Sequence, residues 1–232
     1  MQIKFLGTGG AFEPTYGNSA AIIEFQGKNL LLDAGFTVYP KLVELNLWQQ
    51  LDYILLTHLH NDHCGSLANI LLHCVFHGQG KRPVILYQTE DFKQQIVDFL
   101  NFQLKDATLY TEFKPFTELT GLIYLDTYGR HSIEFQTYSF ILEENGKRLV
   151  YSGDLGDSKF LFDYLGTLPE LATTVYHDVS FNPENKGHAF YTALRPYQNK
   201  YPIFGYHCDP TQQPADNTIP LVYQQPGLCY SY

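Results

Sequence analysis

Short apolar runs, separated by polar and glycine-containing breaks, recur along the whole chain. Runs of this length that are rich in Ile, Leu, Val, Phe and Tyr are typical of buried β-strands. They predict strands at residues 2–6, 20–25, 29–32, 53–56, 83–87, 123–128, 133–142, 148–151, 173–178 and 203–206. Gln26-Gly27-Lys28 and the pair Asn145-Gly146 predict tight turns between neighbouring strands.

Other segments place an apolar residue at every third or fourth position, which is the spacing of a helix with one buried face. These segments predict helices at residues 39–47, 65–76 and 91–100, and short helices at 159–165 and 189–194. Residues 109–116 fit neither pattern, and the segment after Pro210 is typical of a loop.

Strands that come in runs, with helices between some of them, indicate a mixed α/β (α+β) domain. They suit a four-layer αββα sandwich, in which two mixed β-sheets pack together with helices outside. At 232 residues the chain is long enough for one well-buried core. We therefore expect residues 1–232 to form a single domain.

Ligand-type side chains gather directly after the predicted strand at residues 53–56, in the run Thr57-His58-Leu59-His60-Asn61-Asp62-His63-Cys64-Gly65. A strand end directs alternate side chains to one side, so His58 and His60 can converge on one metal ion. Asp62 and His63, on the following turn, can face a second ion. Imidazole nitrogen and carboxylate oxygen suit zinc, and a catalytic zinc keeps a position open for water. The alternative interpretation is that the three histidines and the aspartate are unrelated surface residues, but it gives no reason for their close spacing.

Three further candidate ligands lie beside predicted strands. His131 precedes the strand at residues 133–142, Asp154 follows 148–151, and His207 follows 203–206. Each one alone is more typical of a satisfied polar group or a turn. Their significance depends on whether they complete the set that the first motif begins.

The motif HxHxDH at residues 58–63 resembles the signature of the metallo-β-lactamase superfamily, and the order of the other candidates resembles that of its ligands. This resemblance implies the αββα fold and two Zn²⁺ ions per subunit, with Mn²⁺ as an alternative. It implies one metal at His58, His60 and His131, a second at Asp62, His63 and His207, and Asp154 as the bridge between them. Asp33 would lie behind the ligands and orient one of them or the metal loop.

Several other segments resemble the RNase Z-like branch of that superfamily. The opening of the chain is similar to that of this branch in three segments, Leu6-Gly7-Thr8-Gly9-Gly10, Asn18-Ser19-Ala20 and Leu31-Leu32-Asp33-Ala34-Gly35. The branch's His-Glu-Ala-Thr segment resembles Tyr176-His177-Asp178-Val179-Ser180-Phe181, and its Gly-His-Ser-Thr segment resembles Gly187-His188-Ala189. The resemblance implies that Asp178 pairs with a non-ligand histidine, His188, near the scissile phosphate. It makes Asp62, Asp178 and His188 the candidate catalytic residues. Ala189 and Phe190 replace the two hydroxyl residues of the second segment.

The chain lacks room for the long RNA-gripping arm that transfer-RNA-processing RNase Z enzymes carry between the positions of His131 and Asp154, because residues 132–153 are nearly all hairpin. The formal charge of −9, from 15 Lys and Arg against 24 Asp and Glu, also makes a long nucleic acid a poor partner. A small anionic nucleotide remains compatible, since two dications would reverse the local sign. Among relatives without the arm, the chain resembles compact cyclic-nucleotide phosphodiesterases of the phage anti-Pycsar type, which are typically homodimers.

The cysteines Cys64, Cys74, Cys208 and Cys229 show no paired framework, and the N-terminus has no secretory pattern. No apolar run is long enough to cross a bilayer. We therefore expect a cytoplasmic protein, in the host cytoplasm if a phage encodes it. Cys64 and Cys208 flank ligands and are interpreted as packing residues, and His73, Cys74 and His77 are interpreted as a structural cluster.

The chain contains 18 Tyr and 17 Phe, so aromatic rings are available to stack on a base. Phe12, Tyr16, Phe36 and Tyr206 are candidates for the rim of the site. Together these features predict a dinuclear zinc phosphodiesterase that hydrolyses 3′,5′-cyclic mononucleotides with a metal-activated hydroxide.

Three other functions remain open from the sequence. An RNase Z-like endoribonuclease that processes transfer RNA 3′ ends would need another surface to hold RNA. A thioester or lactone hydrolase can use the same HxHxDH site, but it leaves the segments around Asp178 and His188 without a role. A scaffold that binds a nucleotide or a protein without turning it over would not need every ligand type.

Overall fold

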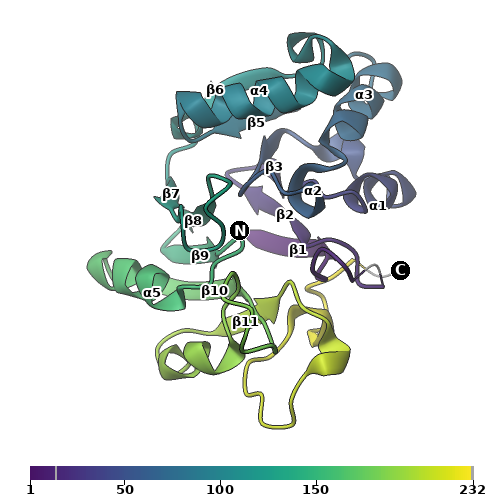
Figure 1. Ribbon diagram of the computed structural model, residues 1–232. Helices are drawn as coiled ribbons and strands as arrows, with labels where there is room; N and C mark the ends of the chain where they lie inside the picture. The colour runs from purple at the N-terminus through teal and green to yellow at the C-terminus, as the bar shows by residue number, and fades with distance from the viewer. Residues whose placement is uncertain (14, 231–232) are drawn as a thin grey trace.

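The computed structural model describes residues 1–13 and 15–230, which form two β-sheets packed face to face with helices on the outer faces (Figure 1). The strands are β1 (Gln2–Gly7), β2 (Ala20–Phe25), β3 (Lys28–Leu32), β4 (Tyr53–Leu55), β5 (Val84–Tyr87), β6 (Glu112–Pro115), β7 (Leu122–Asp126), β8 (Tyr138–Glu144), β9 (Lys147–Tyr151), β10 (Ala172–Asp178) and β11 (Ile203–Tyr206). The α-helices are α1 (Val38–Glu44), α2 (Asn61–Cys64), α3 (Leu67–His77), α4 (Glu90–Leu104) and α5 (Ser158–Thr167). Short 3₁₀ helices occur at Trp48–Gln50, Ala107–Leu109, Phe116–Glu118, Tyr191–Tyr197, Pro210–Gln212 and Val222–Gln224. The predicted αββα sandwich is confirmed.

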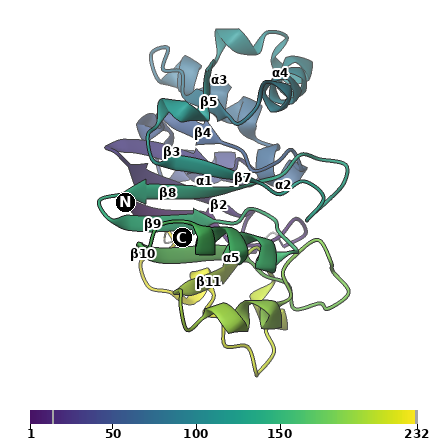
Figure 2. The ribbon, with the colours of Figure 1, turned by 90° about the vertical axis from the view of Figure 1, so that its left-hand side faces the viewer.

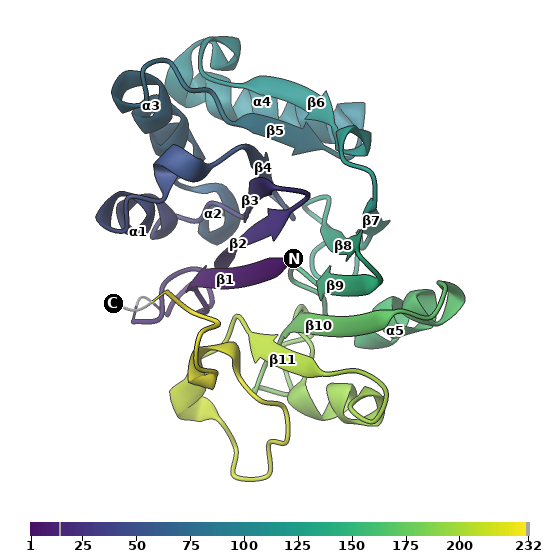
Figure 3. The same cartoon turned by 180° about the vertical axis from the view of Figure 1, so that it is seen from behind.

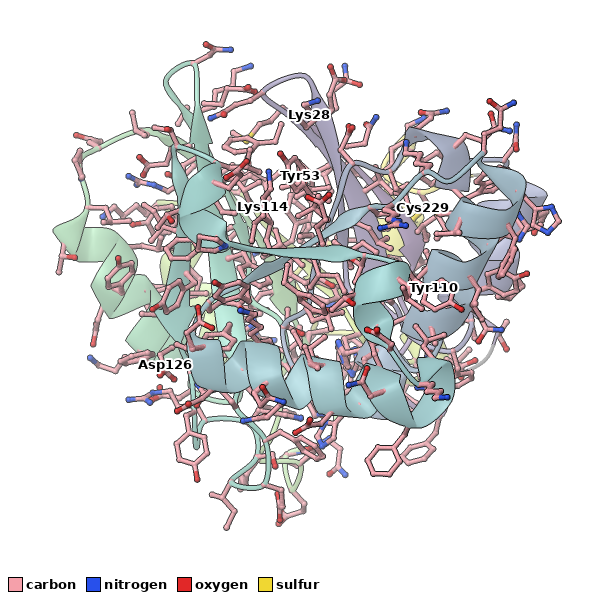
Figure 4. The ribbon with its side chains drawn as sticks, turned by 90° about the horizontal axis from the view of Figure 1, so that it is seen from above. Lys28, Tyr53, Tyr110, Lys114, Asp126 and Cys229 are labelled. Carbon is pink, nitrogen blue, oxygen red and sulfur yellow. The ribbon has the colours of Figure 1, made fainter. Side chains whose placement is uncertain are left out.

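The first sheet has the order β1-β2-β3-β4-β5-β6. Strands β1, β2 and β3 pair antiparallel, and β3 to β6 pair parallel. Figure 4 shows β6 running between the labelled Tyr110 and Lys114, with α4 beside it. The edge strand β6 is only four residues long, and its Lys114 forms an ion pair with Glu118 at 2.8 Å. A short, charged edge discourages pairing with other chains.

The second sheet has the order β11-β10-β9-β8-β7, antiparallel from β7 to β9 and parallel from β9 to β11. Helix α5 covers its outer face, where Leu161, Phe162 and Leu165 belong to the same buried cluster as Val150 and Val175 of the sheet. Asp157 caps this helix by accepting a hydrogen bond from the Phe160 amide at 3.2 Å.

Aromatic rings fill the space between the two sheets. The Phe5 ring lies 5.5 Å from the rings of both Tyr176 and Tyr206, and the Tyr151 ring stacks on Tyr206 at 4.9 Å. These contacts join β1 of the first sheet to β9, β10 and β11 of the second. They bury large apolar area, which is the main favourable term in folding.

Two hairpins show why the sequence folds locally as it does. Gln26 and Gly27 have φ of 52° and 69°, and Asn145 and Gly146 have φ of 52° and 73°. Positive φ at both central residues matches the type I′ turn, whose twist suits adjacent antiparallel strands. The turns therefore set the register of β2 with β3 and of β8 with β9.

The sheet topology brings the carboxyl ends of β1, β3, β4, β9, β10 and β11 to one end of the sandwich. Figure 2 shows α2 at this end and the N-terminus at the opposite end. The segments that follow these strands hold the candidate ligands, so residues far apart in the sequence meet at this edge.

Three local predictions differ from the structure. The strand predicted at residues 133–142 begins only at Tyr138, and Ile133 is exposed in a loop because it has no strand partner. The helix predicted at residues 189–194 is a 3₁₀ helix at Tyr191–Tyr197, which contains Pro196. Proline lacks the amide that a continuous α-helix needs. The undecided segment 109–116 contains the end of a 3₁₀ turn and strand β6.

Candidate metal centre

The first group of potential ligands consists of His58, His60 and His131. The His58 Nε2 and His131 Nε2 atoms lie 2.8 and 3.2 Å from His60 Nδ1. Zinc holds imidazole nitrogens at about 2.0–2.1 Å, so two ligands in a tetrahedral site lie roughly 3.3 Å apart. The spacing of these nitrogens is close to that value.

Neighbouring groups determine which nitrogen each of these rings offers. His131 Nδ1 donates to the Gly187 carbonyl at 2.8 Å. His58 Nδ1 lies 3.0 Å from the Thr57 hydroxyl, which itself donates to Asp33. In neutral rings the Nε2 atoms of His58 and His131 therefore carry lone pairs, and both face His60. One proton on His60 cannot satisfy both, so a cation between the three rings fits the arrangement.

The second group consists of Asp62, His63, Asp154 and His207, and all four are buried. His63 Nε2 lies 3.2 Å from Asp62 Oδ2 and 3.3 Å from Asp154 Oδ2. His63 Nε2 and Asp154 Oδ1 have no hydrogen-bond partner in the part of the chain that the structure describes. Buried polar atoms without partners are costly, and a metal ion would satisfy both.

Asp154 connects the two groups. Its Oδ2 atom lies within 4 Å of five histidines, at 3.9 Å from His58, 3.3 Å from His63, 3.6 Å from His131, 3.9 Å from His188 and 3.4 Å from His207. One carboxylate oxygen among ligands of both groups occupies the place that a bridging ligand needs. The residues present therefore fit a pair of divalent metal ions.

Close approach of the backbone at this end of the sandwich depends on glycines, of which Gly35 and Gly153 lie beside the candidate ligands. A Cβ on Gly35 would lie 1.9 Å from the Asp62 carbonyl oxygen. Gly153, before Asp154, has φ of 61°, and a Cβ there would lie 2.8 Å from the Tyr138 carbonyl oxygen. These two glycines let the metal loop and the Asp154 loop pack against the strands.

Asp33 lies behind the second group, as the sequence led us to expect. It is fully buried, and its Oδ2 accepts a hydrogen bond from His63 Nδ1 at 2.9 Å. Its carboxylate also accepts from the Thr57 amide at 2.8 Å and from the Tyr151 hydroxyl at 3.4 Å. The sequence pointed to Asp33 through its strand end, but nothing in it singled out Thr57 or Tyr151.

Replacing Asp33 with Asn should lower metal affinity by about 10- to 100-fold, because the partner that orients His63 loses its charge. Asparagine tolerates the left-handed backbone of this position, where φ is 62°. A competition titration against a chromogenic chelator measures the effect. Tyr151→Phe, which removes only the longer contact, should change the affinity less, and an unchanged affinity in the Asp33 variant would contradict the orienting role.

His188 and Asp178 form a hydrogen-bonded pair beside the metal ligands. Asp178 Oδ2 accepts from His188 Nδ1 at 2.9 Å, so Nε2 is the nitrogen that His188 can offer to a substrate. Burial lowers the pKa of His188, but the carboxylates of Asp154 and Asp178 outweigh it and raise the pKa to about 9. His188 also falls in a third group of potential ligands with His131 and Asp154. The geometry therefore allows either a proton donor or a ligand.

Asp178 is anchored from several sides. Burial would raise its pKa, but the adjacent His177 ring and the hydrogen bond from His188 lower the pKa below its usual value. Its amide donates to the Ser152 hydroxyl at 2.9 Å. Ser152 precedes the loop of Asp154, so the segments of Asp178 and Asp154 are joined. The sequence offered no signal for Ser152.

Five of the seven candidate ligands, His60, Asp62, His131, Asp154 and His207, line a pocket of about 890 Å³. Phe12 and Phe36, as predicted for the rim, line it, together with Phe181, Asn182, Asn185, Gln212 and the loop of Gly10. Tyr206 does not, because it is fully buried between the sheets, and that interpretation was wrong. Tyr16 packs against Tyr223, with ring centroids 5.1 Å apart, and does not line the pocket. The amides escaped the sequence analysis because loop amides carry no spacing signal.

The remaining histidines and cysteines lie outside the ligand groups found in the described residues. His73 and His77 are stacked on helix α3 with ring centroids 4.4 Å apart, and His73 contacts the Tyr39 hydroxyl at 3.2 Å. Burial raises the pKa of both Cys64 and Cys208 to about 12. Their thiols stay protonated at neutral pH, which agrees with a packing role.

Solved structures with the same arrangement of elements include the metallo-β-lactamase-fold protein YhfI from Bacillus subtilis, at a TM-score of 0.68 and 19% identity over 89% of this chain and 85% of that chain. The short form of human tRNase Z matches at a TM-score of 0.63 and 19% identity over 92% of this chain and 95% of that chain. At these identities the likeness shows the fold. These structures place the chain in the class of proteins with the metallo-β-lactamase fold, and its grouped histidines and aspartates could hold metal ions.

Within this class, the chain belongs to the family described as anti-Pycsar protein Apyc1, whose profile matches residues 1–224. It is similar to the anti-Pycsar protein Apyc1 of Bacillus phage BSP38, at 28% identity over 78% of this chain and 77% of that protein. The protein of the same name from Saccharibacillus brassicae is 41% identical over 87 residues, which is 37% of this chain and 36% of that protein. The predicted resemblance is confirmed.

Proposed function

We propose that this protein is a dinuclear metal phosphodiesterase that hydrolyses 3′,5′-cyclic mononucleotides. The observation that carries the proposal is the Asp154 carboxylate among five histidines at the wall of an open pocket. Relatives named anti-Pycsar proteins support the cyclic nucleotide as substrate. Zinc suits the imidazole and carboxylate ligands, and Mn²⁺ is the alternative.

The residues divide the chemistry between them. When bound, two divalent cations would make hydroxide available from water at neutral pH and neutralise charge on the phosphoryl oxygens. One ion would be held by His58, His60 and His131, and the other would be held by Asp62, His63 and His207. Asp154 would contribute to both sites. His188 would donate its Nε2 proton to the departing ribose oxygen while Asp178 keeps the ring oriented.

The pocket suits a small anion better than a nucleic acid. No Lys or Arg is among the described residues that line it, while Glu13 and Asp209 are. A phosphate would therefore meet positive charge only at the metal ions and His188, and neighbouring phosphates of a long RNA would meet no Lys or Arg among the described lining residues. This charge pattern favours a substrate with a single phosphodiester.

Phe12 and Phe36 would provide the apolar contact for the base. Phe12 is 99% exposed and Phe36 is 44% exposed, although both are large apolar rings. Exposed aromatic side chains beside a polar centre are typical of binding surfaces, and every base has a face on which an aromatic ring can stack. The amides of Asn182 and Asn185 lie in the same pocket and could bond polar edges of the base.

Replacing Phe12 with Ala should raise KM for cyclic mononucleotides by about tenfold, because a stacking contact is lost. Turnover of bis(p-nitrophenyl) phosphate, which has no nucleobase, should change little. Phe102→Ala is the matched control, since Phe102 is 93% exposed on helix α4 and outside the pocket. An equal loss with both substrates would mean that Phe12 shapes the loop and does not contact the base.

The proposed function is tested by a substrate panel on metal-quantified protein. We expect hydrolysis of cyclic mononucleotides to exceed that of cyclic dinucleotides, precursor transfer RNA and acyl thioesters. Preferred cleavage of the precursor RNA would indicate an RNase Z-like endoribonuclease, and preferred cleavage of thioesters would indicate the other hydrolase class. A metal-replete protein that is inert on every phosphodiester would contradict the proposal.

The proposal includes a homodimer in the cytoplasm, or in the host cytoplasm if a phage encodes the protein. In the described residues, the helices are too short or too polar to cross a bilayer. Sedimentation of the metal-loaded protein measures the oligomeric state.

A further inference from the structure

A second groove lies at the end of the sandwich opposite to the metal ligands. It has a volume of about 670 Å³ and is lined by the start of β1, the start of β9 and β10, and the residues just before β11. Residues 227–228 of the C-terminal segment close one side. Figure 3 shows the N-terminus beside β9 and β10, with the yellow C-terminal segment between β1 and β11. We call this the seam groove, because it follows the open seam between the two sheets.

The seam groove is cationic in a strongly acidic protein. Lys4, Lys147, Arg148 and Lys200 line it, and no Asp or Glu is among its described lining residues. Arg148 is already paired with Glu143 at 2.6 Å. The three lysines have no carboxylate within ion-pair distance in the described part of the chain. Three lysines without a carboxylate partner among the described residues therefore line one groove on a chain of net charge −9, and two of them, Lys4 and Lys200, also lie over the rings of Tyr230 and Tyr201.

On the free edge of β1, the main chain of Ile3 has no hydrogen-bond partner among the described residues. In an antiparallel pair, alternate residues direct their N–H and C=O toward the neighbour and away from it. Phe5 directs both away from β2, since its amide donates to the Leu228 carbonyl at 2.7 Å and its carbonyl accepts from the Tyr230 amide at 3.1 Å. Ile3, two residues earlier, faces the same edge. Gly227 and Leu228 of the C-terminal segment line the same groove as Ile3, but among the described residues they form no main-chain hydrogen bond to it.

We propose that the seam groove is a docking site for an extended, acidic peptide segment of a partner protein, which adds alongside the start of β1. Main-chain hydrogen bonds to the edge would provide affinity, as in other cases of strand addition. Acidic side chains on the segment would pair with Lys4, Lys147 and Lys200, and alternate apolar side chains would contact Leu149, Tyr176 and Leu228. The groove is remote from the metal ligands, so docking is separable from catalysis.

A labelled probe peptide tests this directly. The fluorescein-labelled peptide Glu-Val-Glu-Val-Glu-Val should bind wild-type protein saturably in fluorescence anisotropy, more weakly as salt rises. The variant Lys4→Glu/Lys147→Glu/Lys200→Glu should bind the peptide with an affinity at least about tenfold lower. The matched control, Lys93→Glu/Lys105→Glu/Lys159→Glu, makes the same change in net charge elsewhere and should bind like wild type. Hydrolysis of bis(p-nitrophenyl) phosphate should persist in both variants, which checks that they fold.

A second probe separates strand addition from simple charge attraction without any change to the protein. The peptide Glu-Val-Glu-Pro-Glu-Val keeps its charges, but proline removes an amide and prevents strand pairing, so it should bind wild type at least about fivefold more weakly. Equal binding of the two peptides would overturn strand addition in favour of a site for anions in general. No binding of the first peptide at protein concentrations up to about 1 mM would overturn the docking site altogether, and would leave the lysines as protection against edge-to-edge pairing.

Discussion

The His188→Ala variant is expected to lower turnover of cyclic mononucleotides by about 10²- to 10⁴-fold while its metal content stays unchanged. The reason is the hydrogen bond between His188 Nδ1 and Asp178 Oδ2, which leaves Nε2 to protonate the leaving oxygen. The carboxylate of Asp178 also raises the pKa of His188, which favours the protonated ring. Steady-state kinetics with a cyclic mononucleotide, together with metal analysis of the same preparation, measure both parts of the prediction.

The substrate and the control sharpen this result. A phosphodiester with a good leaving group, such as bis(p-nitrophenyl) phosphate, needs less help from an acid and should be affected less. His73→Ala removes a histidine on α3 outside the pocket and should leave turnover unchanged. Loss of metal from His188→Ala would instead make His188 a ligand with His131 and Asp154, which is the alternative that their proximity allows.

Asp154→Asn should abolish stable binding of the metal pair and reduce activity to background. The change removes a negative charge that lies within 4 Å of His58, His63, His131 and His207, while it preserves the shape of the side chain. As the proposed bridge, Asp154 would serve both ions, so its loss should weaken both sites at once. Metal content after gel filtration, and the rise in melting temperature that added Zn²⁺ produces, should both fall strongly.

Asp163→Asn is the control for this variant, because Asp163 lies on helix α5 and pairs with Lys159 on the surface. It should bind metal and turn over substrate like wild type. If Asp154→Asn retained two metal ions per chain, the bridging position would be wrong. Retention of a single ion would assign Asp154 to only one of the two groups.

The sequence located most strands and tight turns correctly, because both depend on residues that are close together along the chain. Apolar runs and the turns at Gly27 and Gly146 found the strands because period and turn chemistry act within a few residues. The predicted start of the strand at residue 133 was wrong, because the sequence alone does not distinguish an apolar residue in an exposed loop, such as Ile133, from one in a strand. Tyr206 failed as a rim residue for a related reason, since its burial depends on the opposite sheet.

By itself the sequence determined the kinds of candidate ligand and their order. The residues from His58 to His63 lie within one strand end and one turn, so their spacing is a local signal, and the later candidates follow in an order that resembles a known family. It also determined the acidic balance that disfavours long nucleic acid. Only the tertiary structure brought Asp154 within reach of both ligand groups, joined His131 to the His188 loop through the Gly187 carbonyl, and opened a cationic groove at the far end. These features depend on which strand ends lie close together across the two sheets, and the spacing of residues along the chain does not determine the distance between those ends.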